Sequence, residues 1–212
     1  MSRFDDQLDA QVRAADLDRW LSSRLVPDAA RRADLITLYA FEAELLAIPT
    51  RVTQPLLAEM RYTWWSEQIE AAFAGSARIG HPVLEALTPV IARHGLDRDA
   101  FDGLITAHIG RVHDQPHDLD AFYVGPARQA ARILSGAAHD AAVDPAARVW
   151  GLIQTGRLDA ARDARPDANR ALRALPAPAF PAVAHAALRD PAAAPEPLKR
   201  LRLIAASFTG RI

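Results

Sequence analysis

The acidic residue best placed for chemistry in this sequence is Glu42. It falls within the apolar stripe of one predicted helix, and the next predicted helix carries Arg61, Trp64 and Trp65. An acid among apolar residues, facing an arginine and two large aromatic rings, is a common setting for a functional group. Glu44 is close by, but two residues apart on a helix the two carboxylates point in different directions and cannot chelate one ion together.

Each of these residues also has a purely structural interpretation. The two tryptophans are expected to be core anchors rather than substrate-stacking residues, because large aromatic side chains dominate burial in helical domains. Arg61 is expected to pair with Glu42 or Glu44 on the neighbouring helix. Such a contact would be a structural ion pair rather than a catalytic one.

A second acidic pair, Asp159 and Asp163, has the i, i+4 spacing that places both carboxylates on one helix face. That face could hold a divalent cation. Arg157, Arg162 and Arg165 are its neighbours in sequence, however, and would pair with the acids as ordinary surface charges. We expect solvated salt bridges there rather than a metal site.

Other kinds of site have weaker support. His113 and His117 also have i, i+4 spacing, but Pro116 between them argues against a single helix. His108 lies on an apolar stripe, as a core histidine does. The sequence contains no cysteine, which excludes disulfides, thiolate metal sites and thiol nucleophiles. It shows no Ser-His-Asp order, phosphate loop or dinucleotide motif.

Composition indicates a single globular domain spanning 1–212, half of it apolar. The formal net charge of -1 gives no global field that would favour nucleic acid. No apolar run approaches the roughly 20 residues that cross a bilayer, and the acidic N-terminus does not resemble a secretory signal. We expect a cytoplasmic protein.

The elements that would position these residues are helices throughout, because apolar residues recur at helical spacing and never alternate for long. Asp28 is predicted to cap a helix over 28–48 that Pro49 stops, and a second helix follows over 53–73. Their shared apolar stripes and short connection predict an antiparallel pair.

Further helices are predicted from apolar periodicity and from the Pro, Gly and Asp residues at their ends. Their expected limits are 5–25, His81 to Gly95, Asp97 to Pro116, 119–134 with an interruption at Gly125-Pro126, a helix begun by Asp144-Pro145, and, after a break at Arg165-Pro166, short proline-bounded pieces. The fold class is therefore all-α.

The last helix, 197–212, is basic and amphipathic. We expect Leu201, Ile204 and Phe208 to pack on the bundle. The basic residues that should remain in water are Lys199, Arg200, Arg202 and Arg211. The alternative is a weak peripheral contact of this helix with a membrane of anionic lipid or with an acidic partner surface.

Three segments, in order, resemble the squalene/phytoene synthase family: YAFEAEL at 39–45, EMRYTWWSEQIE at 59–70 and HPVLEAL at 81–87. The ending LRLIAASFTGRI is similar to a short branch of this family, related to a mitochondrial complex I assembly factor. The resemblance implies the all-α isoprenoid synthase fold, a helical bundle around a central cavity. It also implies that two acidic clusters on facing helices bind Mg²⁺, which offsets the charge of a leaving diphosphate in active members.

This sequence departs from the family pattern at its first acidic cluster. Counting from Tyr39, the paired aspartates of the pattern fall on Leu46 and Ala47, and the third falls on Thr50. None of these side chains is a strong ligand for Mg²⁺. The arginine of the pattern falls on Ala43.

The second acidic cluster of the family aligns with Asp159 and Asp163. The asparagine and arginine that usually precede it correspond to Thr155 and Leu158. The third helix, which usually holds an acid near its end, has Arg111 there.

These departures favour a catalytically degenerate family member that acts by binding and needs no cofactor. Its partner would be a protein, with respiratory complex I assembly implied by the branch, or an isoprenoid or lipid in a retained cavity. The candidate cavity residues are Tyr39, Glu42, Glu44, Arg61, Trp64, Trp65, Asp159 and Asp163. One alternative is an active, Mg²⁺-dependent prenyl diphosphate transferase with displaced acidic ligands. Another is a helical scaffold without a cavity.

Overall fold

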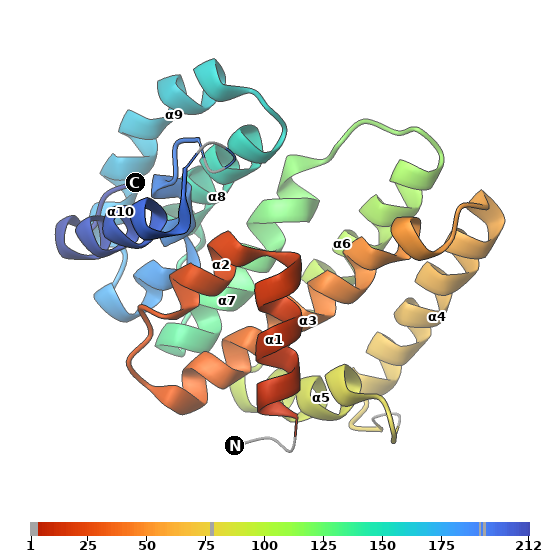
Figure 1. Ribbon diagram of the computed structural model, residues 1–212. Helices are drawn as coiled ribbons and strands as arrows, with labels where there is room; N and C mark the ends of the chain where they lie inside the picture. The colour runs from red at the N-terminus through yellow and green to blue at the C-terminus, as the bar shows by residue number, and fades with distance from the viewer. Residues whose placement is uncertain (1–3, 77–78, 191, 193) are drawn as a thin grey trace.

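Helix α3 (Ala29–Arg51) runs through the centre of the molecule (Figure 1). A computed structural model describes residues 4–76, 79–190, 192 and 194–212, and this part of the chain forms helices and turns without any strand. The all-α prediction is confirmed. The other α-helices are α1 (Asp5–Ala15), α2 (Leu17–Ser23), α4 (Pro55–Phe73), α5 (Pro82–His94), α6 (Arg98–Val112), α7 (Gly125–Ser135), α8 (Asp140–Gln154), α9 (Leu158–Ala171) and α10 (Glu196–Thr209).

The central position of α3 follows from its sequence. Every residue from 34 to 43 is buried, on all sides of the helix, and a helix without a polar face must be covered all round. Helices α1, α2, α5 and α7 provide that cover. Asp28 caps α3 as predicted, its carboxylate accepting hydrogen bonds from the backbone N–H groups of Ala30 and Arg31.

Helix α3 does not stop at Pro49, and this part of the prediction is wrong. Proline removes the N–H that would bond to the carbonyl four residues earlier, here that of Leu45. The hydroxyl of Tyr62, buried on α4, donates to this carbonyl at 3.2 Å. The freed acceptor is therefore satisfied, and the helix continues to Arg51.

Helices α3 and α4 contact each other but are not a closely packed pair along their length. Besides the Tyr62 bond, the rings of Phe41 and Trp65 meet edge to face at 5.5 Å between centroids. Helix α4 packs more extensively on α5 and α6 than on α3. This divergence leaves an open groove between α3 and α4.

Four other predicted boundaries are wrong, each because a proline or cap signal was misjudged. Asp16 splits the expected 5–25 helix into α1 and α2 by accepting a hydrogen bond from the backbone N–H of Arg19. The chain runs through Gly125-Pro126 without a break, because a π-helix (Asp120–Val124) leads directly into α7. Pro145 and Pro166 were expected at helix boundaries, but they lie inside α8 and α9.

Several signals were interpreted correctly. Helix α5 follows His81 and ends at Gly95, whose φ of 56° is the left-handed conformation that favours glycine. Asp97 caps α6. The prolines after α9 produce three short 3₁₀ segments: η2 (Leu172–Ala174), η3 (Ala177–Ala182) and η4 (Ala184–Ala187). No helix in the described part of the chain is long and apolar enough to span a membrane.

Helix α10 packs on α2, η3 and η4, but with the opposite face from the one predicted. Leu203 and Ala206 are buried, whereas Leu201, Ile204 and Phe208 are exposed. Lys199 is also buried, since its ammonium donates to Asp18 of α2 at 2.7 Å. The helix has apolar residues on two opposite faces, so periodicity alone could not tell which one docks.

Candidate functional site

The centre of the molecule holds a buried ion pair where the family pattern leads one to look for catalysis. Glu42 of α3 is 4% exposed, and a guanidinium nitrogen of Arg19 from α2 donates to its Oε2 at 2.5 Å. Arg19 Nε also donates to Asp16 Oδ2 at 2.7 Å. One arginine thus bridges two acids, and the expected partner of Glu42, Arg61, is not involved.

The titration properties of the cluster reflect burial and mutual attraction. Burial raises the pKa of Glu42 although the charge of Arg19 acts against it. For Asp16, burial acts in the raising direction but is outweighed by the charge and hydrogen bonds of Arg19, which lower its pKa. Burial also opposes the charge of Arg19, yet its pKa is raised by Glu42 and Asp16. The arginine is therefore permanently charged.

Two aromatic side chains complete the surroundings of Arg19. The guanidinium lies 4.7 Å from the ring centroid of Tyr39, a cation–π distance, and burial raises the pKa of that phenol. His185 packs edge to face on Trp150 at 4.8 Å between ring centroids. Burial and then the charge of Arg19 lower the pKa of His185 to about 3, so the imidazole is neutral.

Little space remains around this cluster. One cavity beside Glu42 and another beside Arg19 and Tyr39 each have a volume of about 10 Å³. Part of the filling comes from Tyr123 of the π-helix, whose ring lies so close to Gly151 that a Cβ there would approach it to 2.6 Å. Sites for organic ligands usually measure about 300–1,000 Å³, so neither space would admit an isoprenoid chain.

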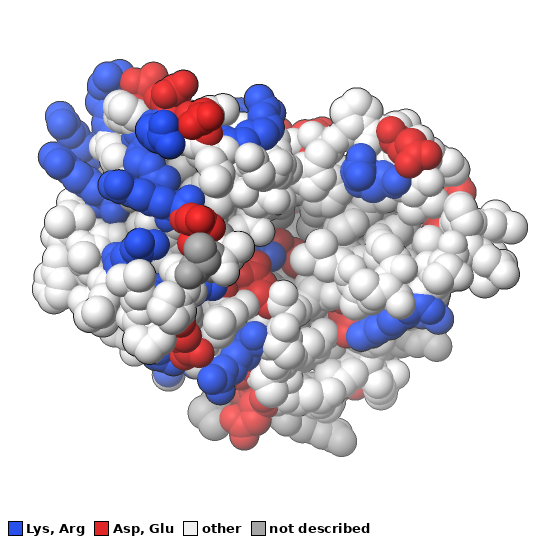
Figure 2. Space-filling model, turned by 45° about the horizontal axis from the view of Figure 1, so that its top comes forward, with Lys and Arg blue, Asp and Glu red and all other residues white. Residues whose placement is uncertain are grey.

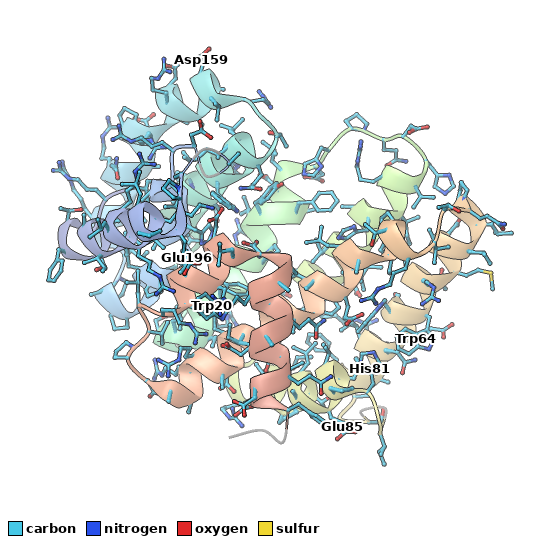
Figure 3. All side chains as sticks on the ribbon, in the orientation of Figure 1. Trp20, Trp64, His81, Glu85, Asp159 and Glu196 are labelled. Atoms are coloured by element: carbon cyan, nitrogen blue, oxygen red, sulfur yellow. The ribbon has the colours of Figure 1, made fainter. Side chains whose placement is uncertain are left out.

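A far larger space, a groove of about 650 Å³, lies between α3 and α4. It is lined by Glu44, Ile48, Arg51, Val52, Leu57, Met60, Arg61, Trp64, Trp65 and His81. The two indole rings pack edge to face at 5.2 Å between centroids, and the His81 ring lies 5.2 Å from that of Trp65. Figure 3 shows Trp64 and His81 next to each other at this side of the molecule.

The charges in the groove are arranged around Glu44. Gln11 Nε2 donates to its Oε1 at 2.7 Å, and a guanidinium nitrogen of Arg51 donates to its Oε2 at 3.2 Å. Arg61 is exposed and has no ion pair with any described residue. The prediction that Arg61 pairs with Glu42 or Glu44 is therefore wrong, because Arg19 and Arg51 occupy those positions.

The positions that hold metal ligands in the family pattern do not line the groove. These positions are Leu46, Ala47 and Thr50, whereas α3 lines the groove with Glu44, Ile48 and Arg51. Leu46 is exposed, and Thr50 donates to a backbone carbonyl of its own helix. The groove is thus formed by other side chains of α3 than those at the family's ligand positions.

The second candidate pair is far from both features. Asp159 has a side-chain exposure of 89% and pairs with Arg162 at 3.2 Å, and Asp163 is exposed as well. In Figure 3, Asp159 points outward from α9, at the other end of the molecule from Trp64. Within the described residues, no three His, Asp or Glu side chains are grouped so as to hold a metal ion. The donors present therefore do not fit the magnesium cluster of the family's active members.

Sequence reasoning missed Arg19, Asp16 and His185, which surround the candidate Glu42. They come from segments 23 or more residues away, so no local spacing could reveal them. One signal did exist: a carboxylate in an apolar stripe needs a cationic partner. That rule predicts that a partner exists without identifying it.

Comparison with known proteins locates the chain in a family. A sequence model of the family "Squalene/phytoene synthase" matches residues 12–124, just over half of the chain. The match includes Arg19, Glu42 and the whole α3–α4 groove, but not Asp159 or Asp163. No curated protein and no solved structure gave a match. The chain, with the all-α architecture of its matched helices, belongs to the squalene/phytoene synthase family.

Proposed function

We propose that this protein is a non-catalytic member of its family and that it acts by binding a protein partner in the groove between α3 and α4. The observation that supports it most is the Arg19–Glu42 ion pair. The only carboxylate of the first-site stretch that points into the protein is already neutralised by an arginine. Leu46, Ala47 and Thr50 provide no carboxylate in its place.

The lost chemistry follows from what Mg²⁺ requires. The ion needs several oxygen donors in near-octahedral order, and a diphosphate leaves only when its charge is offset. Asp159 and Asp163 could supply two oxygens, but they face solvent on α9. Asp159 is exposed on α9 and Glu42 is buried at the centre, so the two carboxylates cannot hold one substrate between them.

The groove has the composition of a protein interface. Tryptophan, methionine and arginine are enriched at such surfaces and contribute many of their strongest contacts. Met60 is 59% exposed at the groove, and Leu56 on the adjacent turn is 68% exposed. Leu57, Arg61 and Trp64 follow one another by four and three residues, so apolar and cationic groups alternate along one helix face.

This pattern specifies the chemistry of the partner. An apolar segment would bury Leu57, Met60 and Trp64, and an acidic side chain beside it would pair with Arg61. The branch of the family that the C-terminal sequence resembles is related to a complex I assembly factor. A subunit or assembly intermediate of a respiratory complex is therefore the first partner to examine.

The non-catalytic part of the proposal is tested by incubation with prenyl diphosphates and Mg²⁺. We expect diphosphate release at the background rate. Release above background that is abolished by Glu44→Ala or Asp159→Ala would instead establish an active transferase with displaced ligands.

The binding part is tested by site-specific photo-crosslinking in the cells that make the protein. A benzophenone side chain replaces Leu57 in the groove, and Leu158, an exposed leucine on α9, serves as the matched control position. We expect one protein adduct of defined mass from position 57, absent from position 158 and lost when Trp64→Ala is added. Adducts that are the same from both positions, or that carry lipid rather than protein, would contradict a protein partner.

A further inference from the structure

Helix α10 presents an unpartnered apolar ridge to solvent. Leu198, Leu201, Ala205 and Phe208 follow one another by three or four residues and therefore lie along one face of the helix. All four are exposed, Leu201 at 65% and Phe208 at 87%. The helix lies along an outer edge of the fold (Figure 1).

The opposite face of the same helix is firmly docked. Leu203 and Ala206 are buried against the bundle, and the ammonium of Lys199 is held by Asp18 at 2.7 Å. Beyond the end of α10, the backbone of Ile212 exchanges hydrogen bonds of 2.8 and 3.1 Å with the side chain of Asn169 on α9. The ridge is thus preformed, and contact with a surface would not require the helix to fold.

Unpaired cationic side chains lie beside the ridge and at the end of its helix. By helical position, Arg202 lies on one flank, and Arg211 follows the helix just beyond its end at Gly210; neither has an ion pair within the described residues. The acid of α10, Glu196, is its first residue and pairs with Arg200. Figure 2 shows lysine and arginine side chains gathered over the end of the molecule that α9 and α10 form, with acidic side chains among them.

We propose that α10 docks on an anionic lipid surface, with its ridge of Leu198, Leu201 and Phe208 in the interfacial region and its arginines at the head groups. An exposed aliphatic and aromatic strip that contains no acid and is bordered by Arg202 matches a flat surface that is apolar below and negative above. The α3–α4 groove is concave and contains an acid, Glu44, so it does not match such a surface. The proposal is independent of the partner proposed for that groove.

Flotation of the full chain with vesicles tests this assignment. One set of vesicles is phosphatidylcholine alone, and the other includes phosphatidylglycerol. We expect reversible binding to the anionic vesicles that weakens at high salt. Arg202→Gln combined with Arg211→Gln should lower the partition coefficient by about fivefold for each arginine.

The apolar ridge has a matched control in the chain. Leu201→Ser with Phe208→Ser should lower binding by about tenfold or more, because it removes the largest apolar groups that would enter the lipid. Leu56→Ser with Met60→Ser removes side chains of similar exposure from α4 and should leave binding unchanged. Equal loss in both pairs, or no binding by the wild-type chain, would overturn the proposal.

A direct contact measurement does not depend on loss of binding. Phe208→Trp keeps a large aromatic side chain on the ridge, and its fluorescence, taken as the difference from the wild-type chain, should be quenched by brominated lipid in anionic vesicles. Absence of quenching in a variant that still floats would show that another surface carries the binding.

Discussion

Two of the regions where carboxylates and arginines meet differ in burial, and the same ion-pair chemistry contributes differently to stability in each. At the centre, Arg19 connects Glu42 and Asp16 in a cluster shielded from water. On α9, Asp159 and Arg162 pair while both remain largely exposed. Exposed pairs contribute little because water already solvates each charge, whereas separating a buried pair leaves a charge without solvent or partner.

The comparison also shows which carboxylate depends on its partner. A carboxylate at the centre of a helical bundle is costly to bury without a partner. Arg19 offsets that cost by pairing with Glu42. The external pair on α9 needs no such compensation, because both of its side chains are exposed. Burial, more than residue type, determines which ion pair the fold requires.

Arg19→Met is the substitution with the largest expected effect on stability, because it breaks the buried ion pair rather than the exposed one. It leaves Glu42 buried and unpaired, so we expect the free energy of unfolding to fall by about 3–5 kcal/mol in urea titrations. Adding Glu42→Leu should restore part of this loss, since only the less buried carboxylate of Asp16 then remains without its arginine. A single variant as stable as wild type would show that the cluster is solvated and that the contrast with α9 does not hold.

The next effect depends on pH and concerns His185 beside the cluster. Its pKa falls from the ordinary value of 6.5 to about 3 in the folded protein, so the unfolded chain binds a proton first as pH falls. Stability is therefore complete above pH 6.5 and is lost below it, at about 1.4 kcal/mol per pH unit for this group. Burial lowers the pKa of His108 to about 4, which adds to the loss over a narrower range.

Thermal or urea unfolding between pH 7 and 4 separates the contribution of His185. His185→Gln should reduce the pH dependence of stability. A pH profile that is the same in His185→Gln and in the wild-type chain would mean that His185 is accessible to water in the folded state.

A smaller effect is expected at the bond that compensates for Pro49. Tyr62→Phe removes the hydroxyl that satisfies the Leu45 carbonyl, and a buried acceptor without a donor costs about 1–3 kcal/mol. Urea titration measures it. If the bond exists to compensate for the proline, Pro49→Ala should make the loss from Tyr62→Phe smaller, because the carbonyl regains its helical donor.

The smallest effect is predicted on α9. Asp159→Asn and Asp163→Asn should each change the free energy of unfolding by less than about 0.5 kcal/mol, as expected at exposed positions. Calorimetric titration with Mg²⁺ should give the same weak signal before and after both substitutions. Tight binding that disappears in the double variant would identify α9 as a metal site after all.

The sequence predicted a helix end correctly where a residue at that same end determines it. Asp28, Asp97 and Gly95 act within one turn of their own helix ends, and each was assigned correctly. Pro49 was misjudged because its effect depends on a partner elsewhere in the chain. Pro49 is tolerated since Tyr62, thirteen residues later, supplies the missing hydrogen bond.

The candidate site shows the same limit. Glu42 and Tyr39 were recognised as interior residues from the apolar stripe alone, but the cation that neutralises Glu42 comes from α2. Helix α10 shows the limit more clearly. Apolar residues recur at helical spacing on two of its faces, so the sequence pattern could not predict which face is buried. The Lys199–Asp18 bond decides between them, and its partners are 181 residues apart.

That separation has a consequence for the order in which the protein assembles during synthesis. The hydroxyl of Ser22 donates to the carbonyl of Pro181, and Asp18 accepts from Lys199, so the packing of α2 is completed by residues 159 and 181 positions later in the chain. Until those segments are synthesised, α2 can pack only on its earlier neighbours α1 and α3. Contacts this distant along the chain slow folding. We therefore expect α2 to reach its final packing only after η3 and α10 have been synthesised.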